Sequence, residues 1–500
     1  MINLCQSTLP QLACSRLVDV PTYDRSALRP SVVHIGVGGF HRAHQAVYLD
    51  DLARAGSTEW GEVGVSLRSR GLCSELAEQD DLFSVVELGT EGERPRVVAA
   101  MTDYLFGPDD PRAVVARLAL PDTRLVTLTV TGDGYDDAGE VGATAPEDDA
   151  TWSAYLVAAL AQRRGAGLGG FTVLSCDNRD QSGAAARNAV LRRAARRDET
   201  LARWIRRNVT FPEAMVDRIT PGSGDQLRAL MARRYGLTDR SPVATEPFRQ
   251  WVIEDSFCQG RPPLEDVGAQ LVSDVAPYKV VKSRLLNGTH TAVAYLGWLA
   301  GHRTTAELTS DPTMLDFLTE LMRSEVAPQL VSVPGMGIDD YVDTVLQRLA
   351  NPRIADPLDR LCRRGSTKVP AYLLPALSAA VRAGRRAPLL TLALAGWFRY
   401  LRGVDLHGRV IEIDDARLAE LQPLARRGGH DPAPLLGVRD VLGGLGEERS
   451  VRTELRRALG DLDHGVAPAV RRALARADHG WRHPLAVTDG SLGPSPDLIS

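Results

Sequence analysis

A short apolar strand, a glycine turn and a helix follow one another near the start of the chain. The apolar run is Ser31–Ile35, the turn is Gly36-Val-Gly38-Gly39, and the helix runs through Gln45–Leu52. Glycines let a backbone approach a pyrophosphate closely, and a helix N-terminus offers it unpaired N–H groups. The usual third glycine, three residues after Gly38, is replaced by His41. The segment fits either a dinucleotide site or an ordinary strand-to-helix turn.

Strand-like runs continue through the first half and alternate with helical patterns such as Ala113–Leu118 and Tyr155–Arg164. The runs are Glu62–Leu67, Phe83–Leu88, Arg124–Thr131, Phe171–Cys176, Ala214–Ile219 and Pro242–Thr245. This alternation predicts an α/β, Rossmann-like N-terminal domain with a mostly parallel sheet, which binds ligands beyond the carboxyl ends of its strands. We place this dinucleotide-binding domain at residues 1–274.

Two strand ends carry polar residues that we expect to open onto the cofactor. The run that ends at Thr131 is followed by Gly132 and Asp133, and the run that ends at Cys176 is followed by Asp177 and Asn178. The Asn178 amide has two possible tasks, since it could cap the helix that follows or hold a substrate oxygen.

The strand Glu62–Leu67 should end in an acidic residue if the site binds the adenosine ribose of NAD. The sequence instead continues Arg68-Ser69-Arg70. Two cations and a hydroxyl suit a ribose 2′-phosphate, so NADP stays open beside NAD. A solvated loop is the structural alternative.

Helical periodicity dominates after Pro277. Helical patterns cover Lys279–Ala300, Asp339–Ala350, Pro370–Ala383, Leu389–Arg402, Ser450–Leu459 and Val466–Ala477. These patterns predict a mostly α-helical, substrate-binding C-terminal domain at residues 275–500. Five hundred residues are also more than one core usually accommodates, so two domains agree with the length.

Lysine is scarce in this chain, and two of its lysines begin the second domain. Of 59 basic residues only Lys279, Lys282 and Lys368 are lysines, and 56 are arginines. A desolvated lysine can lose its proton and arginine cannot, so a retained lysine marks a place where a base is useful. On an α-helix, Lys282, Asn287 and His290 project at about 0°, 140° and 80°, so they can face one cleft. The alternative is the water-facing side of an amphipathic helix.

Composition excludes several classes of function. The net charge of −4 arises from interspersed charges of both signs, which gives no reason to expect nucleic acid or an anionic membrane as partner. No apolar run is long enough to span a bilayer, and no secretion signal precedes Asp19. The six cysteines form no C-x-x-C pair and the histidines no metal-binding motif. We expect a cytoplasmic, metal-independent enzyme without coiled-coil heptads, either a monomer or a weak homo-oligomer.

Five ordered motifs resemble the polyol-specific long-chain dehydrogenases, the mannitol 2-dehydrogenase and fructuronate reductase group. The motifs are Gly36–His44, Ser175–Asn178, Met215–Pro221, Thr245–Asp255 and Lys282-x4-Asn287-x2-His290. The resemblance implies an N-terminal Rossmann domain, an α-helical C-terminal domain and oxidation of a secondary alcohol by NAD.

The resemblance also implies roles for single residues. Lys282 matches the general base, Asn178 and Asn287 match amides that polarise the reacting oxygen, and His290 matches a substrate-orienting residue. Asp217, Arg360 and Lys368 match positions that line the sugar pocket. Amide donors of this kind stabilise charge that develops on oxygen, and the base needs a pKa well below the 10.4 or so that is usual for lysine. The expected cofactor contacts are Gly36, Gly38, Gly39, Phe40, Arg42, Arg68 and Thr131.

Three positions depart from the pattern of this family. Gly132-Asp133 and Lys279 stand where the family commonly has glutamates, and Asn178 is followed by Arg179 and not by a proline-containing turn. We hypothesise that Lys279, one turn before Lys282, lowers the pKa of the base if the two amines approach.

The leading interpretation is an oxidoreductase that interconverts a sugar alcohol and a ketose, most simply D-mannitol and D-fructose. A fructuronate reductase stays close, because Arg360 and Lys368 could hold a sugar carboxylate and Val65–Ser69 resembles that branch. A catalytically inactive binding or regulatory homologue is the third alternative, against which the intact Lys-Asn-His set argues.

Overall fold

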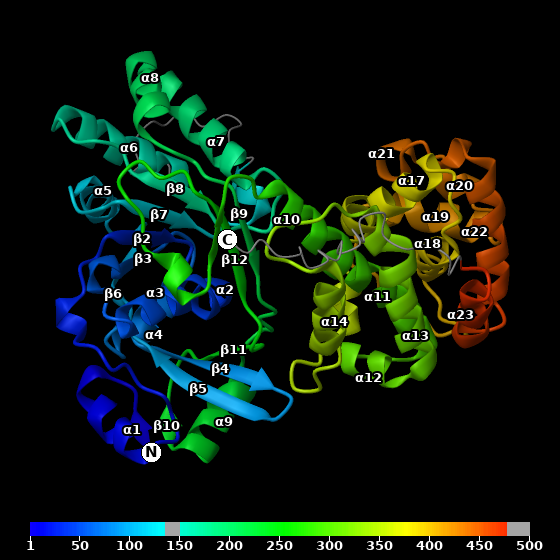
Figure 1. Cartoon of the computed structure of the whole chain (residues 1–500), viewed down its shortest axis with the longest axis horizontal. Helices are drawn as coiled ribbons and strands as arrows, with labels where there is room; N and C mark the ends of the chain where they lie inside the picture. The colour runs from blue at the N-terminus through cyan, green and yellow to red at the C-terminus, as the bar shows by residue number, and fades with distance from the viewer. Residues whose placement is uncertain (136–150, 478–500) are drawn as a thin grey trace, which may run out of the picture. The chain divides into compact units, whose positions relative to one another are not determined.

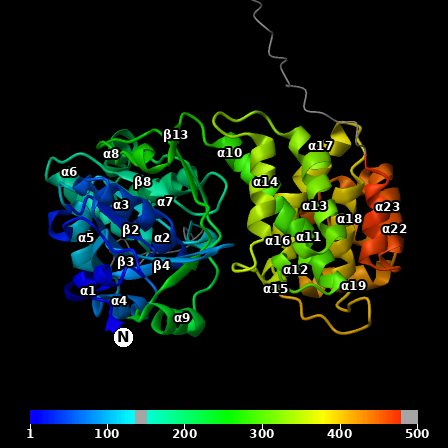
Figure 2. The ribbon, with the colours of Figure 1, turned by 60° about the horizontal axis from the view of Figure 1, so that its bottom comes forward.

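A computed structural model describes residues 1–135 and 151–477 of the chain. The chain divides into two compact units. Unit 1 holds residues 1–279 and 351–354, and unit 2 holds residues 280–350 and 355–500. The domain limits predicted from the sequence stay predictions. The fold class, a Rossmann-type α/β unit followed by a helical one, is confirmed (Figures 1 and 2).

Unit 1 is built on a five-stranded parallel sheet. Its strand order is β6-β3-β2-β7-β8, with β6 Met101–Phe106, β3 Glu62–Ser66, β2 Val32–Ile35, β7 Leu125–Leu128 and β8 Thr172–Ser175. In this order β2, which leads into the glycine turn, lies at the centre. The carboxyl ends of β2, β7 and β8 therefore lie next to each other, as the sequence predicted for the strand ends around Thr131 and Asp177.

Apolar layers cover both faces of this sheet. Val33, Val126 and Val173 point to one face and pack on helices α5 to α8, whereas Val32, Leu125 and Leu174 point to the other and pack on α3 and on Trp251. Alternation of buried side chains between faces is the period-two pattern of a strand that is covered on both sides. The helices of this unit are α1 Leu9–Ser15, α2 Gly39–Ala43, α3 Gln45–Arg54, α4 Arg70–Ala77, α5 Pro111–Ala119, α6 Trp152–Gly165, α7 Ser182–Arg197, α8 Glu199–Asn208 and α9 Asp225–Tyr235. The next helix, α10 Ala276–Val281, begins in unit 1 and ends in unit 2.

Three predicted strands lie outside the parallel sheet, which is a correction to the sequence interpretation. β4 Phe83–Gly89 pairs with β5 Gly92–Val98 in an antiparallel hairpin and with β11 Val243–Thr245, while β9 Ala214–Asp217 pairs antiparallel with β12 Gln250–Glu254. Only two residues separate β4 from β5, and so short a turn permits antiparallel pairing alone. The remaining strands are β13 Gln270–Val272 beside β12, and β1 Ile2–Asn3 beside β10 Leu237–Thr238.

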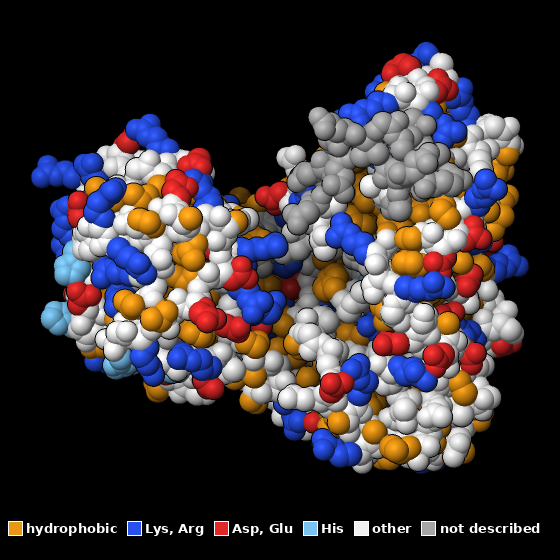
Figure 3. Space-filling model, turned by 180° about the vertical axis from the view of Figure 1, so that it is seen from behind, with side chains coloured by type: hydrophobic (Ala, Val, Ile, Leu, Met, Phe, Trp, Pro, Cys, Tyr) orange, Lys and Arg blue, Asp and Glu red, His pale blue; other side chains and the backbone are white. Residues whose placement is uncertain are grey.

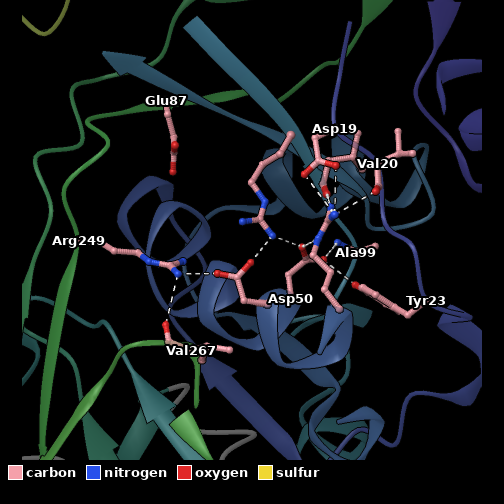
Figure 4. Close-up of polar contacts among 12 residues, drawn as sticks. Asp19, Val20, Tyr23, Asp50, Glu87, Ala99, Arg249 and Val267 are labelled. Carbon is pink, nitrogen blue, oxygen red and sulfur yellow. Dashed lines mark hydrogen bonds and ion pairs between the residues drawn. The ribbon is translucent and has the colours of Figure 1, made fainter. Parts of the chain in front are cut away.

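A fully buried carboxylate ties α3 to the segments around it (Figure 4). Asp50 accepts hydrogen bonds from the Tyr23 hydroxyl at 2.6 Å and from the Ala99 amide at 2.9 Å. It also pairs with the guanidinium groups of Arg54, at 2.7 Å, and Arg96. Four donors, from α3 itself, from the segment around Tyr23 and from β5 with the residue that follows it, thus satisfy one buried charge. This is the condition under which such a charge is tolerated.

The same network extends to Asp51. Although burial raises the pKa of its carboxyl, Arg96 and Arg249 at 2.7 and 2.6 Å hold that pKa below its ordinary value. Arg249 also donates to the Val267 carbonyl at 3.4 Å. Charge-assisted hydrogen bonds therefore join four parts of the chain, namely the segment around Tyr23, helix α3, strand β5 and the segment around Val267.

Among the residues that the structure describes, unit 2 consists of helices and the loops that join them. Its helices are α11 Gly288–Ala300, α12 Thr305–Ser310, α13 Pro312–Glu320, α14 Ile338–Leu349, α15 Leu358–Cys362, α16 Gly365–Lys368, α17 Leu374–Arg382, α18 Pro388–Tyr400, α19 Leu418–Gly428, α20 Ala433–Leu436, α21 Arg439–Leu442, α22 Arg449–Leu462 and α23 Val466–Leu474. Every residue of α18 is buried, and α11 and α22 pack against it, so α18 forms the centre of this unit.

A buried carboxylate also closes the N-terminus of α18. Glu325 accepts hydrogen bonds from the Leu389 and Leu390 amides, both at 2.8 Å. Burial raises the pKa of Glu325 to about 8, and the two amides oppose that rise. The carboxylate satisfies N–H groups that have no partner within the helix.

Charges of both signs are interspersed on the face of the molecule that Figure 3 shows. Within residues 1–135 and 151–477, no helix is both long and apolar enough to cross a membrane.

Replacing the buried carboxylate of Asp50 tests the role of its network. We expect Asp50→Asn to lower the free energy of unfolding by about 3–5 kcal/mol, because the largely buried guanidinium groups of Arg54 and Arg96 lose the buried carboxylate that they share. Urea unfolding followed by fluorescence measures this value. Asp225→Asn is the control, since the Asp225 side chain is 94% exposed in its pair with Arg228, and we expect a change of at most about 0.5 kcal/mol there. Equal losses in the two variants would contradict the assignment.

Candidate active site

The glycine turn has the geometry that a dinucleotide requires. Gly36 has a φ of +103°, and a Cβ there would lie 2.2 Å from the Thr129 carbonyl oxygen, so only glycine fits. Gly38 caps α2 in an extended conformation, and a Cβ at Gly39 would meet nothing within 4 Å. The backbone beside the start of α2 is therefore open to a ligand, as the pyrophosphate of NAD needs.

Residues just after the turn point into the protein. The Arg42 guanidinium is buried, donates to the carbonyls of Gly38 and Ser241, and lies 5.4 Å from the Phe83 ring centre. Burial lowers the pKa of Arg42 to about 10. Phe40 is half-buried and stacks on His44 with ring centres 5.1 Å apart. Arg42 thus hydrogen-bonds the glycine turn from its buried side.

A buried pair lies under the same turn. His41 Nε2 and Glu62 Oε1 are 2.9 Å apart, and neither side chain is exposed. Burial lowers the pKa of His41 to about 3, and burial raises the pKa of Glu62 to about 7. Between about pH 3 and 7, the proton of this pair is therefore on the Glu62 carboxyl, and the His41 imidazole is neutral.

Asp177 organises the carboxyl ends of β7 and β8. Its carboxylate accepts hydrogen bonds from the Val130 amide at 3.1 Å, the Thr131 amide at 2.9 Å and the Tyr135 hydroxyl at 2.6 Å. Thr131 is held at a φ of +68°, a conformation that is costly for a β-branched residue. Burial raises the pKa of Asp177, an effect that Tyr135 and the two amides oppose.

Asn178 follows Asp177 directly and is exposed. Helix α7 begins only at Ser182, and its N-cap residue is Gln181. The alternative that Asn178 caps this helix is therefore wrong. Its position, three residues after the end of β8, is at the carboxyl edge of the parallel sheet.

The Arg68-Ser69-Arg70 segment lies at the end of β3 and is exposed. Arg70 pairs with Asp109 at 2.7 Å, and the Ser66 hydroxyl donates to the Ser69 carbonyl at 3.1 Å. An acidic partner therefore already compensates one of the two cations that a 2′-phosphate would use. Asp217, the last residue of β9, is buried.

Lys279 forms an ion pair within unit 1. Its ammonium lies 2.6 Å from Glu213, whose carboxylate also accepts the Ala184 amide at 3.0 Å. The lysine that replaces a family glutamate is thus compensated by a carboxylate of this chain. The side chains of Gly132 and Asp133, the other departure, lie outside the described part of the structure.

The Lys-Asn-His segment opens unit 2, and its local structure differs from the predicted α-helix. Lys282–Asn287 is a π-helix, and the Gly288 amide donates to the Ser283 carbonyl, five residues back. In such a turn, residues five apart lie about one turn apart, so Lys282 and Asn287 share a face more closely than in an α-helix. The Lys282 side chain is buried.

A distant stretch of unit 2 lies beside this segment. The π-helical turn Val369–Leu373 packs against Lys282–Asn287, and Arg284 donates to the Ala371 carbonyl at 3.3 Å. Lys368 immediately precedes that turn. Within unit 2, the segment that carries the predicted base Lys282 therefore packs against the turn that directly follows Lys368, a predicted residue of the sugar pocket.

Arg360 and Lys368 have partners inside the protein. The Arg360 guanidinium forms a two-point ion pair with buried Asp356, with one contact of 2.8 Å. The Lys368 ammonium donates to the carbonyls of Leu361 and Arg360 at 3.0 and 3.2 Å. Burial, then the neighbouring Arg360, lowers the pKa of Lys368.

Sequence reasoning did not identify His34 and Glu62 as residues of the site. A signal existed for both, because each stands in an apolar strand where a buried polar group needs a partner. Asp177, by contrast, follows a strand end that we expected to open onto the cofactor.

Two protein-family models together match most of the chain. The mannitol dehydrogenase Rossmann domain matches residues 30–266, and the mannitol dehydrogenase C-terminal domain matches residues 274–463. The chain belongs to the mannitol dehydrogenase family. A mannitol 2-dehydrogenase of Phaeosphaeria nodorum is 41% identical over 91% of this chain and 83% of its own length. A mannitol dehydrogenase of Saccharomyces cerevisiae is 41% identical over 87% of this chain and 88% of its own length.

Solved structures give the same assignment. The Pseudomonas fluorescens mannitol 2-dehydrogenase, in a ternary complex with NAD and D-mannitol, matches with a TM-score of 0.82 and 39% identity, over 95% of this chain and all of that chain. A substrate-free D-sorbitol dehydrogenase matches with a TM-score of 0.86 and 33% identity, over 94% of this chain and all of that chain. The predicted resemblance is confirmed, as is the predicted class of enzyme, an NAD-dependent polyol dehydrogenase.

The pKa shifts of the buried pair in this family member predict how stability depends on pH. Between pH 4.5 and 7 the folded protein binds more protons than the unfolded chain at Glu62, which lowers stability as pH rises. Between pH 3 and 6.5 it binds fewer at His41, which raises stability as pH rises. The two effects cancel from about pH 4.5 to 6.5.

Replacing Glu62 by glutamine removes only the first effect. We expect the free energy of unfolding of Glu62→Gln to rise with pH between about 4.5 and 6.5, with a slope steeper than that of the unaltered protein by up to about 1.4 kcal/mol per pH unit. Urea titrations at half-unit pH intervals measure this slope. Parallel curves for the two proteins would show that Glu62 does not hold the proton.

Proposed function

We propose that this chain catalyses the NAD-dependent interconversion of D-mannitol and D-fructose. The observation that carries the proposal is the similarity over 95% of the chain to an enzyme solved with NAD and D-mannitol. The open glycine turn of unit 1 and the buried lysine of unit 2 supply the dinucleotide site and the base that this reaction needs.

In the proposed mechanism, oxidation removes a proton and a hydride from one secondary alcohol. Lys282, as an uncharged amine, accepts the hydroxyl proton at Nζ while the carbon–oxygen bond becomes a carbonyl. The bound nicotinamide ring supplies the hydride acceptor. Asn178 and Asn287 donate to the oxygen as negative charge develops on it, and His290 orients a neighbouring hydroxyl. Fructose reduction runs the same steps in reverse.

The partners of Arg360 and Lys368 favour a neutral sugar alcohol over a hexuronate. A fructuronate reductase needs a cation for the substrate carboxylate. Asp356 already neutralises Arg360, and two backbone carbonyls engage Lys368. Asp217 and these two residues remain proposed contacts of the sugar hydroxyls.

The proposed cofactor contacts divide into two groups. Gly36, Gly38, Gly39 and Thr131 lie at the carboxyl edge of the sheet, and Phe40 and Arg68 lie beside it. Arg42 acts through the turn that it supports. We take NAD as the cofactor, and NADP as the alternative that Arg68 leaves open.

We propose that the enzyme is located in the cytoplasm and that it acts as a monomer or a weak homo-oligomer. All six cysteines are free thiols, which suits a reducing compartment.

A substrate panel tests the proposed activity. We expect the purified protein to oxidise NADH with fructose, and to be much slower with fructuronate, tagaturonate and xylulose and with NADPH in place of NADH. Loss of nicotinamide absorbance measures each rate. No rate with any ketose, despite NADH binding, would indicate an inactive homologue, and a preference for fructuronate would move the chain to the other branch of the resemblance.

Lys282→Ala tests the base. We expect kcat for mannitol to fall by about 100-fold or more, because general-base catalysis contributes at least that much, while NADH still binds. The matched control is Lys279→Gln, which removes a lysine one turn earlier and keeps a donor for Glu213. We expect kcat of the control within about threefold of the unaltered value. A Lys282→Ala enzyme within about tenfold would place the base elsewhere.

A further inference from the structure

The residue in place of the third glycine belongs to a buried cluster. His41 stacks on His34 of β2, with ring centres 3.5 Å apart and planes 8° apart, and Glu62 of β3 contacts its Nε2. None of the three side chains has any exposed surface. A set of ionisable groups this deeply buried under a ligand-binding turn requires a physical reason.

The stack performs the task of the missing glycine in another way. The third glycine of a dinucleotide turn lets the helix pack directly on the strand. Here an imidazole from α2 lies flat on an imidazole from β2, so their stacking sets the separation between helix and strand. The hydrogen bond to Glu62 fixes the rotation of the His41 ring, and with it the direction of the first turn of α2.

His34 also begins a directed chain of hydrogen bonds that ends at the turn. The Thr129 hydroxyl donates to the Gly36 carbonyl at 2.8 Å, so it must accept from His34 Nε2–H at 2.9 Å. His34 Nδ1 then accepts from the Thr127 hydroxyl at 2.8 Å. Each hydroxyl has one proton, so this chain fixes the His34 tautomer as well as the Gly36 carbonyl.

The same three residues have the spacing of a metal site, but their geometry does not suit one. The ligand atoms of His34, His41 and Glu62 lie within 4.8 Å of one another. Imidazole lone pairs lie in the plane of the ring, so two rings stacked in parallel planes cannot both aim at one ion. Both nitrogens of His34 also already face threonine hydroxyls.

We propose that His34, His41 and Glu62 are positioning residues for the dinucleotide, which hold the glycine turn in its binding conformation from inside the sheet. The inference rests on the dinucleotide site and not on the identity of the sugar. Its consequence is that breaking the cluster weakens cofactor binding and leaves the chemical step at saturating cofactor nearly unchanged.

Paired variants separate positioning from general stability. We expect Glu62→Leu and Thr129→Val to raise the Kd for NADH by about five- to hundredfold, since each leaves a buried polar group without its partner. Glu62→Gln and Thr129→Ser keep a hydrogen-bonding group in place and should stay within about threefold. NADH fluorescence titration gives Kd without any substrate, so the result stands whether or not mannitol is turned over.

Steady-state kinetics separate an effect on NAD binding from an effect on the chemical step. In Glu62→Leu and Thr129→Val we expect KM for NAD to rise with Kd, and kcat at saturating NAD to stay within about threefold. Glu325→Gln, a buried carboxylate of unit 2, is the control and should leave Kd unchanged. Thr129 is only partly buried, so its variants remain informative if Glu62→Leu fails to fold.

Three results would overturn the proposal. The first is an unchanged Kd in Thr129→Val, and the second is a fall in kcat with Kd unaltered. The third is a stoichiometric metal in the purified protein whose removal by a chelator abolishes NADH binding, which would make the cluster a metal site.

Discussion

Buried hydrogen bonds around residues 38–44 are the interactions on which the dinucleotide site depends. Arg218 donates to the Ala43 carbonyl, and His44 Nε2 lies 2.9 Å from the Gln250 carbonyl. Together with the contacts of His41 and Arg42, these bonds connect the glycine turn to the parallel sheet and to the segments of the two three-stranded sheets. The turn is therefore a fixed surface onto which a pyrophosphate can bind without ordering the chain first.

The parts of the site that the sequence revealed are those where chemistry restricts the residue type. Gly36 was identifiable because its position admits no Cβ, and Lys282 because a desolvated amine cannot be replaced by arginine. The carboxyl ends at Thr131 and Asp177 followed from the alternation of strands and helices, which also gave the order of the two units.

Most of what the sequence did not reveal depends on contacts between distant residues. The pairing of β9 with β12 depends on packing around Trp251. The antiparallel pairing of β4 with β5 is an exception, because a local two-residue turn sets it. The π-helical turn at Lys282 and the ion pair between Lys279 and Glu213 have no local signature. Arg42 looks like a phosphate ligand by position, and only the fold shows that it points to Ser241.

The two units supply different requirements of one reaction. Unit 1 presents an open backbone at Gly39 and amide groups at strand ends, which suit an anion and a developing oxyanion. Unit 2 buries an amine in a π-helical turn, a local structure often found at functional sites. In the proposed mechanism these features act together in polyol oxidation.

We predict that the glycine turn is already rigid before the cofactor binds, and amide hydrogen exchange measures this directly. The Gly36, Arg42 and His44 amides donate to the carbonyls of Val65, Gly38 and His41. In the cofactor-free enzyme we predict that these amides exchange as slowly as those of β2, and that adding NAD changes them little. Rapid exchange that becomes slow only when NAD is added would show instead that the cofactor, and not the buried cluster, orders the turn.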